Sequence, residues 1–153
     1  MATPTQQTAL YVYNESGTPE VVEIGCPTSI SGAGSTNESI ETTCLSDDSR
    51  TYIPGLSSPG EVTFDVNFST SDTSHMLLED MRKNRTVAAW AIGFSDGTSA
   101  PTYATDKLTF TSRSAIAFNG FVTSVEFGFE QNAVVTASIG IQVTGDVSVT
   151  AKA

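Results

Sequence analysis

The stretch Glu61–Asn84, EVTFDVNFSTSDTSHMLLEDMRKN, changes its hydrophobic period halfway along. Its first half alternates apolar and polar residues, which is the period of a strand buried on one face. The apolar positions of that half are Val62, Phe64, Val66 and Phe68. From Asp72 onward the apolar residues fall at helical spacing instead, at Leu77, Leu78 and Met81. The stretch therefore predicts a strand followed by a helix whose apolar stripe packs against a sheet.

The ends of this helix carry the expected capping signals. Ser71 or Asp72 can cap the N-terminus, where a carboxylate also meets the positive end of the helix dipole. Arg82 and Lys83 lie near the negative end, and Asn84 can stop the helix.

The rest of the chain reads as strands. We expect them at residues 21–26, 38–45, 86–94, 107–112, 115–130 and 134–145. Residues 86–94 are apolar on both faces and should be buried on both. In residues 115–130 one face should carry Phe121, Val125, Phe127 and Phe129, and the other Glu126 and Glu130. Inward positions of the last strand should be Val135, Ala137, Ile139, Ile141 and Val143.

Glycine, proline and serine mark the connections between these strands. Residues 27–37 and 46–60 should be loops, with Ile40 pointing inward in the strand between them, and Ser95–Thr98 should be a hairpin turn. The fold class is thus mainly β, an antiparallel β-sandwich or barrel with one flanking α-helix that covers a sheet edge or an open end. We expect one domain over residues 1–153, with a flexible arm at about 1–17 and a last edge strand or tail at 146–153.

The chain is acidic, with 17 Asp and Glu against 7 Lys and Arg. This balance argues against nucleic-acid binding, because affinity for phosphates comes from basic residues. It fits either an ordinary soluble surface or a surface that must not adhere to a polyanion.

No basic and apolar leader opens the sequence and no apolar run is long enough to span a bilayer, so we expect synthesis in a cytoplasm. Cys26 and Cys44 should then be reduced, with a bridge between them as the alternative.

Catalytic and metal-binding patterns are missing. His75, the single histidine, has no nucleophile motif beside it, and one His with two Cys matches no zinc spacing. The pairs Glu61/Asp65 and Glu126/Glu130 read as a solvated acidic face rather than as a glycosidase pair. We expect no cofactor, no metal and no enzymatic activity.

Several segments in order resemble a known family. They are SRTYIPGL at residues 49–56, GEVTFDVNF at 60–68, FNGFVTSVEF at 118–127 and VTASIGIQVTG at 135–145. From about Val21 to Gly145 the chain resembles the major tail tube proteins of long-tailed, non-contractile bacteriophages, the lambda major tail protein group.

That resemblance implies a structural virion protein, made in the host cytoplasm, that forms hexameric rings stacked into a hollow tail tube. Each subunit would contribute strands to one barrel around the channel, with Leu77, Leu78 and Met81 packing the helix outside it. Glu61, Asp65, Glu126 and Glu130 are candidates for the lumen, which DNA crosses during ejection without specific binding. Arg50, Tyr52, Ile53 and Leu56 are candidates for ring stacking. The implied partners are other copies, the tape-measure protein and tail-end proteins, with no membrane.

Three alternatives remain open at this point. The first is a tube protein of a contractile tail or a secretion machine, which follows the same fold logic. The second is a carbohydrate-binding or adhesin sandwich, which would need exposed aromatic residues. The third is an enzyme, which is the weakest alternative because the sequence has no pattern of catalytic residues.

Overall fold

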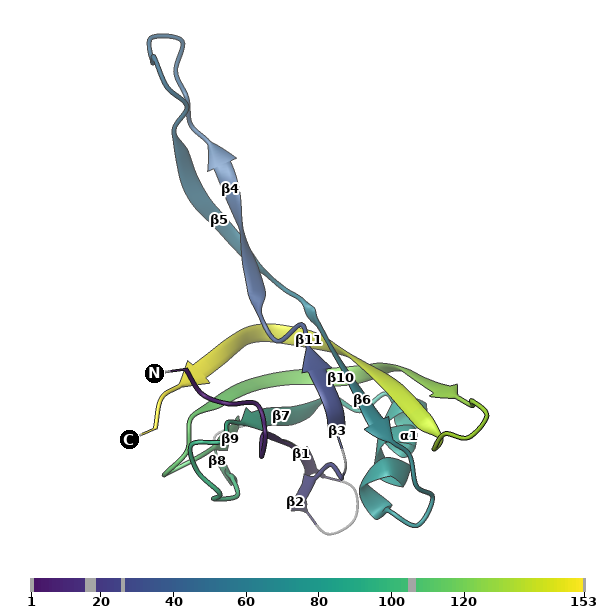
Figure 1. Cartoon of the computed structure of the whole chain (residues 1–153). Helices are drawn as coiled ribbons and strands as arrows, with labels where there is room; N and C mark the ends of the chain where they lie inside the picture. The colour runs from purple at the N-terminus through teal and green to yellow at the C-terminus, as the bar shows by residue number, and fades with distance from the viewer. Residues whose placement is uncertain (1, 16–18, 26, 105–106, 153) are drawn as a thin grey trace.

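A seven-stranded antiparallel sheet dominates the computed structural model of the chain, which describes residues 2–15, 19–25, 27–104 and 107–152. The strand order is β2-β1-β7-β10-β11-β6-β3, and the sheet curls around one core (Figure 1). The strands of this sheet are β1 Ala9–Asn14, β2 Glu20–Glu23, β3 Pro27–Ser31, β6 Glu61–Asn67, β7 Ala88–Gly93, β10 Ala115–Gly128 and β11 Thr136–Thr150. Two ribbons, β4 Ser35–Glu41 with β5 Tyr52–Pro59 and β8 Thr102–Ala104 with β9 Lys107–Thr109, and the helix α1 Thr73–Asn84 complete the fold.

The main core lies inside the curl. It contains Leu10, Val62, Phe64, Trp90 and Ile139, all less than 2% exposed, and α1 covers it with Leu78 and Met81. Trp90 donates its indole N–H to the carbonyl of Gly120 at 3.1 Å, which satisfies its polar group in the interior. The prediction of a mainly β fold with one helix is confirmed.

Strand β7 is buried along its whole length, as its two-sided apolar sequence predicts. One face belongs to the main core, and Ala89 and Ala91 on the other join a second cluster with Tyr11 and Leu108. The β8–β9 ribbon supplies Leu108 and so covers the back of the sheet.

Helix α1 begins and ends close to the predicted positions. The Asp72 carboxylate accepts hydrogen bonds from the N–H of Ser74 at 3.0 Å and from its hydroxyl at 2.7 Å. The helix stops one residue later than predicted, because Arg85 rather than Asn84 adopts the left-handed conformation, at φ 55°. Its N–H then reaches the carbonyl of Met81.

His75 is a packing residue at the start of α1, and it is 1% exposed. Its Nδ1 accepts the N–H of Ser69 at 3.0 Å, and its Nε2 lies 2.6 Å from the carbonyl of Gly25. These two bonds select the neutral tautomer with the proton on Nε2. The histidine therefore fastens the segment before β3 to the beginning of the helix.

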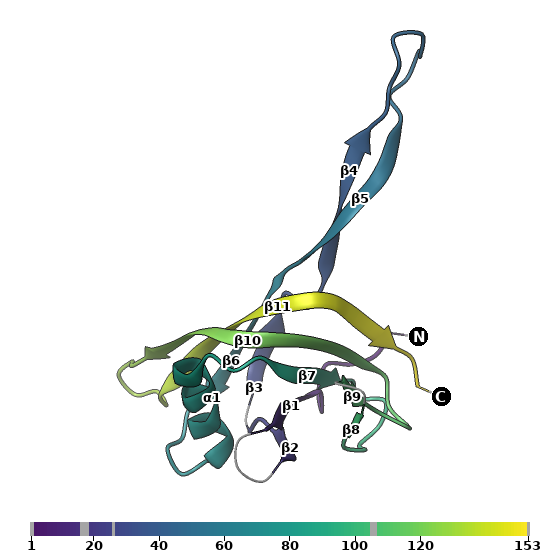
Figure 2. The ribbon, with the colours of Figure 1, turned by 180° about the vertical axis from the view of Figure 1, so that it is seen from behind.

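Two predicted loops are strands. Residues 27–31 form β3 on the edge of the sheet, and residues 52–59 form β5, which pairs with β4 in a long hairpin that projects from the body (Figure 2). Ile40, which we expected to point inward, is 51% exposed on this hairpin. β5 is held by backbone pairing rather than by a core, and in β3 only Ile30 packs against the core, so neither strand shows the alternating pattern that identifies a half-buried strand.

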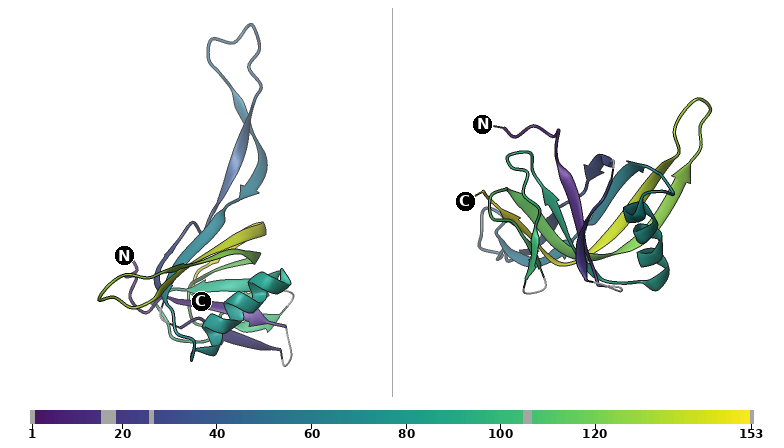
Figure 3. Two further views of the ribbon diagram at one scale, coloured as in Figure 1. Left: turned by 90° about the vertical axis from the view of Figure 1, so that its right-hand side faces the viewer. Right: turned by 90° about the horizontal axis from the view of Figure 1, so that it is seen from below.

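Both ends of the chain differ from the prediction in the same way. Residues 9–14, expected in a flexible arm, form β1 with Leu10 and Val12 fully buried. Residues 146–150, expected in a separate edge strand or tail, continue β11, and residues 148–150 pair with residues 115–117. The two termini lie on the side of the sheet away from α1 (Figure 3).

Arg113, which is 3% exposed, connects the N-terminal segment with the end of β7. Its guanidinium donates to the carbonyls of Gly93, Phe94 and Gln7 and to the hydroxyl of Tyr11. Sequence patterns do not identify such a residue, because its partners are backbone carbonyls distant along the chain.

The Asp-Gly turn at residues 95–98 is present, but β7 pairs with β1 and β10, so it is not a hairpin turn.

A bulge in β10 changes which side chains face the core. The register shifts between Val122 and Ser124, so Val122 is buried while Phe121 lies opposite Gln142. Phe121 thus shares a face with Glu126 and not with Val125, contrary to the prediction. A bulge inserts one residue and inverts the alternation beyond it. Phe129 lies past the end of β10 and is 76% exposed.

Candidate assembly and channel surfaces

The outer side of β3, β6, β11 and β10 forms a continuous polar face, which we call the polar sheet face. Its core side carries Val62, Phe64 and Ile139, and alternation places the polar residues opposite them. The polar sheet face consists of Ser29, Ser31, Glu61, Thr63, Asp65, Asn67, Ser124, Glu126, Thr136, Ser138 and Gln142. Neither these positions nor the strand segments that carry them contain a Lys, Arg or His.

Asp65 lies near the middle of this face. Its carboxylate accepts hydrogen bonds from the hydroxyl of Ser138 on β11 and from that of Ser29 on β3, the latter at 3.1 Å. The register pairs Ser138 with both Asp65 and Glu126, so the two carboxylates lie in one row across three strands. Neighbouring strands are about 4.8 Å apart, which puts these two residues about 10 Å from one another.

Glu61 lies at the other end of β6, on the same face. Its carboxylate accepts a hydrogen bond from Thr123 at 3.3 Å and lies over Gly140. A Cβ on residue 140 would come 2.5 Å from Glu61 Oε1, so glycine leaves the room that this side chain occupies.

Three of the four predicted lumen residues therefore share one surface. Glu61, Asp65 and Glu126 lie on the polar sheet face, whereas Glu130 follows β10 in the turn before β11. The sequence did not place Ser29 on this surface, because β3 was expected to be a loop. Ser138 was expected to point outward from the alternation of the last strand, but its contact with Asp65 depends on the pairing of β11 with β6.

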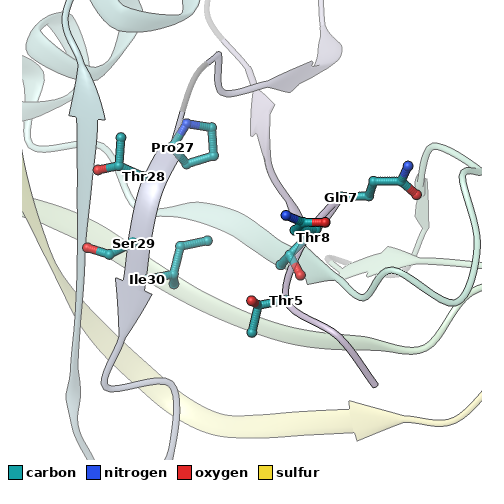
Figure 4. A pocket seen from close by; sticks show the side chains of 8 residues that line it. Thr5, Gln7, Thr8, Pro27, Thr28, Ser29 and Ile30 are labelled. Atoms are coloured by element: carbon teal, nitrogen blue, oxygen red, sulfur yellow. The ribbon is translucent and has the colours of Figure 1, made fainter. Parts of the chain in front are cut away.

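This sheet region ends in two unpaired edges. Beyond Gly120 no described strand pairs with the outer side of β10, because β7 has ended. At the other end, β3 pairs with β6 alone. A hollow of about 520 Å³ lies between β3 and residues 5–8, and Figure 4 shows the side chains that line it from both segments. Because β3 pairs with no described strand other than β6, the curled sheet is an open barrel.

The β4–β5 hairpin is the second candidate surface, and all four predicted stacking residues lie on β5 or in the loop that joins β4 to β5. Tyr52, Ile53 and Leu56 belong to β5, and Leu56 is 82% exposed. Arg50 lies just before β5 and is 3.9 Å from the Glu41 carboxylate. Leu45 and Ile40 add to this exposed apolar surface, and the sequence reading did not assign them to it. The free cysteine Cys44 is also exposed here, while Cys26 lies outside the described residues.

The predicted helix-packing residues contact the core. Leu78 and Met81 are buried in it, and Leu77 packs against it while half-buried. Within the described residues no three His, Cys, Asp or Glu side chains gather in a way that could hold a metal ion. α1 is too short and too polar to cross a membrane, and the described part of the chain has no helix that could.

The family match defines the class of protein, a structural protein that builds the tube of a phage tail. The chain belongs to the family of lambda-like phage tail tube proteins, described as "Phage tail tube, TTP, lambda-like", whose model matches residues 1–153. It is 43% identical over 147 residues to "Structural protein 3" of Pseudomonas phage PAJU2, an alignment that covers 92% of this chain and 89% of that protein. The chain is thus a structural protein of the tail tube in a phage virion.

Solved structures share the fold at low sequence identity. The SPP1 tail tube has a TM-score of 0.69 at 14% identity, covering 97% of this chain and 80% of that one. The sheath-tube complex of an extracellular contractile injection system, PVC, gives 0.71 at 17%, covering 98% and 92%. The tail of a GTA particle, refined with C6 symmetry, gives 0.69 at 14%, covering 98% and 100%. Since contractile and phage tails share the fold, the family match rather than the fold distinguishes them.

Proposed function

We propose that this chain builds the tail tube as hexameric rings, each closed by pairing the free edge of β10 in one copy with β3 of the next. The observation that carries the proposal is that the sheet with the polar face ends in these two unpaired edges. Unpaired edges expose N–H and C=O groups that a neighbouring strand can satisfy, and a closed barrel removes them altogether. A head-to-tail contact of this kind generates rings. The C6 symmetry of the GTA tail, which has the same fold, supports six copies.

The polar sheet face then lines the channel. Its carboxylates repel phosphate, and without a Lys, Arg or His the face offers no cation that could pair with the DNA backbone. Two unit charges 4 Å apart interact by about 1 kcal/mol even in water, and salt screens this over about 8 Å at physiological ionic strength. Repeated around and along the tube, Glu61, Asp65 and Glu126 would keep DNA from adhering as it passes. The four predicted lumen residues, Glu130 included, remain part of this proposal.

The hairpin connects one ring to the next. The side chains of Tyr52, Ile53 and Leu56 expose apolar surface to water in the isolated subunit. Exposed apolar surface of this kind is typical of a protein interaction site. Contact with an adjoining ring would bury it, and Arg50, in the loop between β4 and β5, would pair with a carboxylate on the neighbouring copy. We also expect contact with a tape-measure protein inside the tube and with proteins at its two ends, and a role without catalysis.

Electron microscopy of the purified protein tests the assembly. We expect tubes of uniform width that average with sixfold symmetry about their axis. A chain that remains monomeric at every concentration and salt condition, or rings of another symmetry, would contradict the proposal.

The channel assignment needs a phage that carries the variant. Glu61→Lys with Asp65→Lys should still assemble but slow DNA ejection, because both changes place cations in the lumen. Ejection is followed by DNA release after receptor addition. Glu20→Lys with Glu23→Lys, on β2 away from the polar sheet face, makes the same change in net charge and should leave ejection unchanged. Equal ejection rates in both variants would show that Glu61 and Asp65 do not line the channel.

A further inference from the structure

The chain crosses from one end of the sheet to the other at Gly25. β2 and β3 follow one another in the sequence, but they are the two outermost strands in the strand order. β2 ends at Glu23 and β3 begins at Pro27, so a very short connection spans the opening of the curled sheet. The position of this connection therefore determines where the β3 edge lies relative to the rest of the barrel.

The N-terminal end of α1 holds Gly25 by both of its backbone groups. The N–H of Gly25 donates to the hydroxyl of Ser74 at 3.1 Å, and its carbonyl accepts from Nε2 of His75 at 2.6 Å. The Ser74 hydroxyl in turn donates to the Asp72 carboxylate at 2.7 Å, which leaves its oxygen to accept from Gly25. We call Asp72, Ser74 and His75 the Gly25 clamp.

The clamp is closely fitted to a glycine at residue 25. A Cβ there would overlap the Asp72 carboxylate and lie 3.7 Å from Nε2 of His75. Ser74 and His75 are buried, at 3% and 1% exposure, so water cannot readily replace them as partners of Gly25. Loss of either bond would leave a polar backbone group without its partner, which is unfavourable in the interior.

β3 has few anchors besides this clamp. Ile30 is its residue that packs against the core, and its other residues are half-buried or exposed. β3 pairs with β6 along one edge, while Ser29 and Ser31 form hydrogen bonds on the exposed polar sheet face. An edge strand of five residues with so little buried surface opens locally at low free energy. The anchoring of its first residues is therefore important for its order.

His75 also contacts the region of the second unpaired edge. Its ring stacks on that of Phe68 with the centroids 5.6 Å apart, and Phe68 meets Phe127 of β10 edge-to-face at 4.9 Å. Phe127 belongs to the part of β10 that extends beyond its pairing with β7. Nδ1 of His75 accepts the N–H of Ser69, the residue after Phe68, at 3.0 Å. One buried side chain thus connects the entry to β3 with the free part of β10.

The arrangement differs from a catalytic triad, although it contains an Asp, a Ser and a His. In a triad the histidine accepts the proton of the serine hydroxyl and is oriented by the aspartate. Here backbone groups engage both ring nitrogens of His75, and the Ser74 hydroxyl donates directly to Asp72. Neither ring nitrogen is placed to act as a base toward Ser74, and the geometry is that of a structural clamp.

We propose that the Gly25 clamp is a positioning device for ring closure, which holds the β3 edge where the β10 edge of the next copy can pair with it. This inference rests on the proposed function, because it names the residues that prepare one of the two closing edges. An edge that must become ordered during association binds more weakly than one that is ordered beforehand. The clamp orders β3 in the isolated subunit, before a second copy arrives.

Ser74→Ala tests the clamp with little other change. It removes the acceptor of the Gly25 N–H, while Asp72 can still accept the N–H of residue 74 and so cap α1. Amide exchange of Thr28–Ser31 in the isolated subunit, followed by NMR, should become about fivefold faster or more. The protein concentration needed for tube assembly, measured by pelleting of tubes, should rise by a similar factor. Ser74→Thr retains the hydroxyl and should behave like the parent.

Ile92→Val is the control for a general loss of stability. It shortens a core side chain in β7 that is 5% exposed, and such a change costs about as much as a lost hydrogen bond. Exchange in β3 and the assembly concentration should stay at the parent values. His75→Phe gives a second test, because it retains a ring beside Phe68 and loses both hydrogen bonds. Its effect should be at least as large as that of Ser74→Ala, and thermal unfolding verifies that each variant is folded.

The outcomes separate this inference from the proposed function. Unchanged exchange of β3 in Ser74→Ala and His75→Phe would show that the clamp does not hold this strand. Faster exchange with assembly at the parent concentration would show that holding β3 does not prepare it for closure, and the inference would be wrong while the tube function stands. The same follows if Ile92→Val weakens assembly as strongly as Ser74→Ala. A parent protein that forms no tubes would overturn the proposed function itself.

Discussion

The curled sheet and the β4–β5 hairpin are both antiparallel β-structure, but they are stabilised in different ways. Strands of the sheet bury Trp90, Phe64 and Ile141, which are 1% exposed or less. Every residue of β4 is exposed, and in β5 only Gly55 and Pro59 are even half-buried. The hairpin joins the body where β5 passes into β6 at Pro59–Gly60, so it extends the β3–β6 pair beyond the core.

The body is stabilised by its own core, whereas we propose that the hairpin is stabilised by assembly. A two-stranded ribbon alone is at best marginally stable in water, since it buries little surface. The body can offset the entropy of its own ordering with its core. The hairpin instead keeps its apolar residues exposed and would bury them against another copy.

Removing the hairpin should produce the largest difference between the two regions. Replacement of residues 37–57 by an Asn-Gly turn joins Thr36 to Ser58, which are already paired. We expect the body to fold, with a change in unfolding free energy below about 1 kcal/mol, because no core residue is lost. Tube formation should be abolished. Urea unfolding, monitored by the fluorescence of Trp90, measures the stability of the body, and electron microscopy detects tubes. Tubes formed by the shortened chain would show that the hairpin is not required for assembly.

Single truncations should show the same contrast at smaller scale. Phe64→Ala removes a core side chain that is 1% exposed and should cost about 3–5 kcal/mol of unfolding free energy. Leu56→Ala, on the hairpin, should change it by no more than about 0.5 kcal/mol while weakening assembly. Chemical unfolding of the isolated subunit measures both. A large loss for Leu56→Ala would mean that the hairpin packs on its own body in solution.

The smallest effect concerns the cap of α1, which lies within the body. Asp72→Ala should cost about 1 kcal/mol, because the N–H of Ser74 loses its acceptor. Hydrogen bonds from the hydroxyl and then the N–H of Ser74 hold the pKa of Asp72 below its ordinary value of 3.8. Glu38→Ala on the hairpin is the control and should leave stability nearly unchanged.

The sign of the pH dependence follows from that pKa. Because folding lowers the pKa, the charged carboxylate stabilises the folded state fully when the pH is well above 3.8. This contribution is lost as the pH falls through the ordinary value to the lower pKa of the folded state. The parent should therefore lose stability more steeply than Asp72→Ala in this range, as measured by thermal unfolding across acidic pH. Parallel curves would show that the cap contributes nothing.

The sequence predicted best those elements that are half-buried or fully buried. Residues 61–67 show strict alternation, and β6 follows it at every position. β7 could be read from its two-sided apolar run, and α1 from the change of period and Asp72. Each of these signals arises because side chains point alternately to the core and to water, with a period that is fixed by the strand or the helix.

Elements held by pairing or by distant partners could not be predicted. β3 and β5 show no apolar repeat and were expected to be loops. A strand was expected at residues 38–45, but β4 spans Ser35–Glu41 and its Ile40 is exposed rather than inward. The bulge after Val122 placed Phe121 on the same side of the sheet as Glu126, and a bulge depends on the partner strand rather than on local sequence. Of the candidate lumen residues, Glu61 and Asp65 could be placed on one face from β6 alone, whereas the position of Glu126 beside them required the register of β11.

The amino-acid order alone determined that this chain is mainly β with one helix, acidic, and similar to tail tube proteins, because burial periods and charge are local properties. Only the tertiary structure decided that the sheet stays open at β3 and β10, that the hairpin projects, and that Glu61, Asp65 and Glu126 share one face. Those features depend on which strands pair and in which register, and pairing is a relation between segments far apart in the chain.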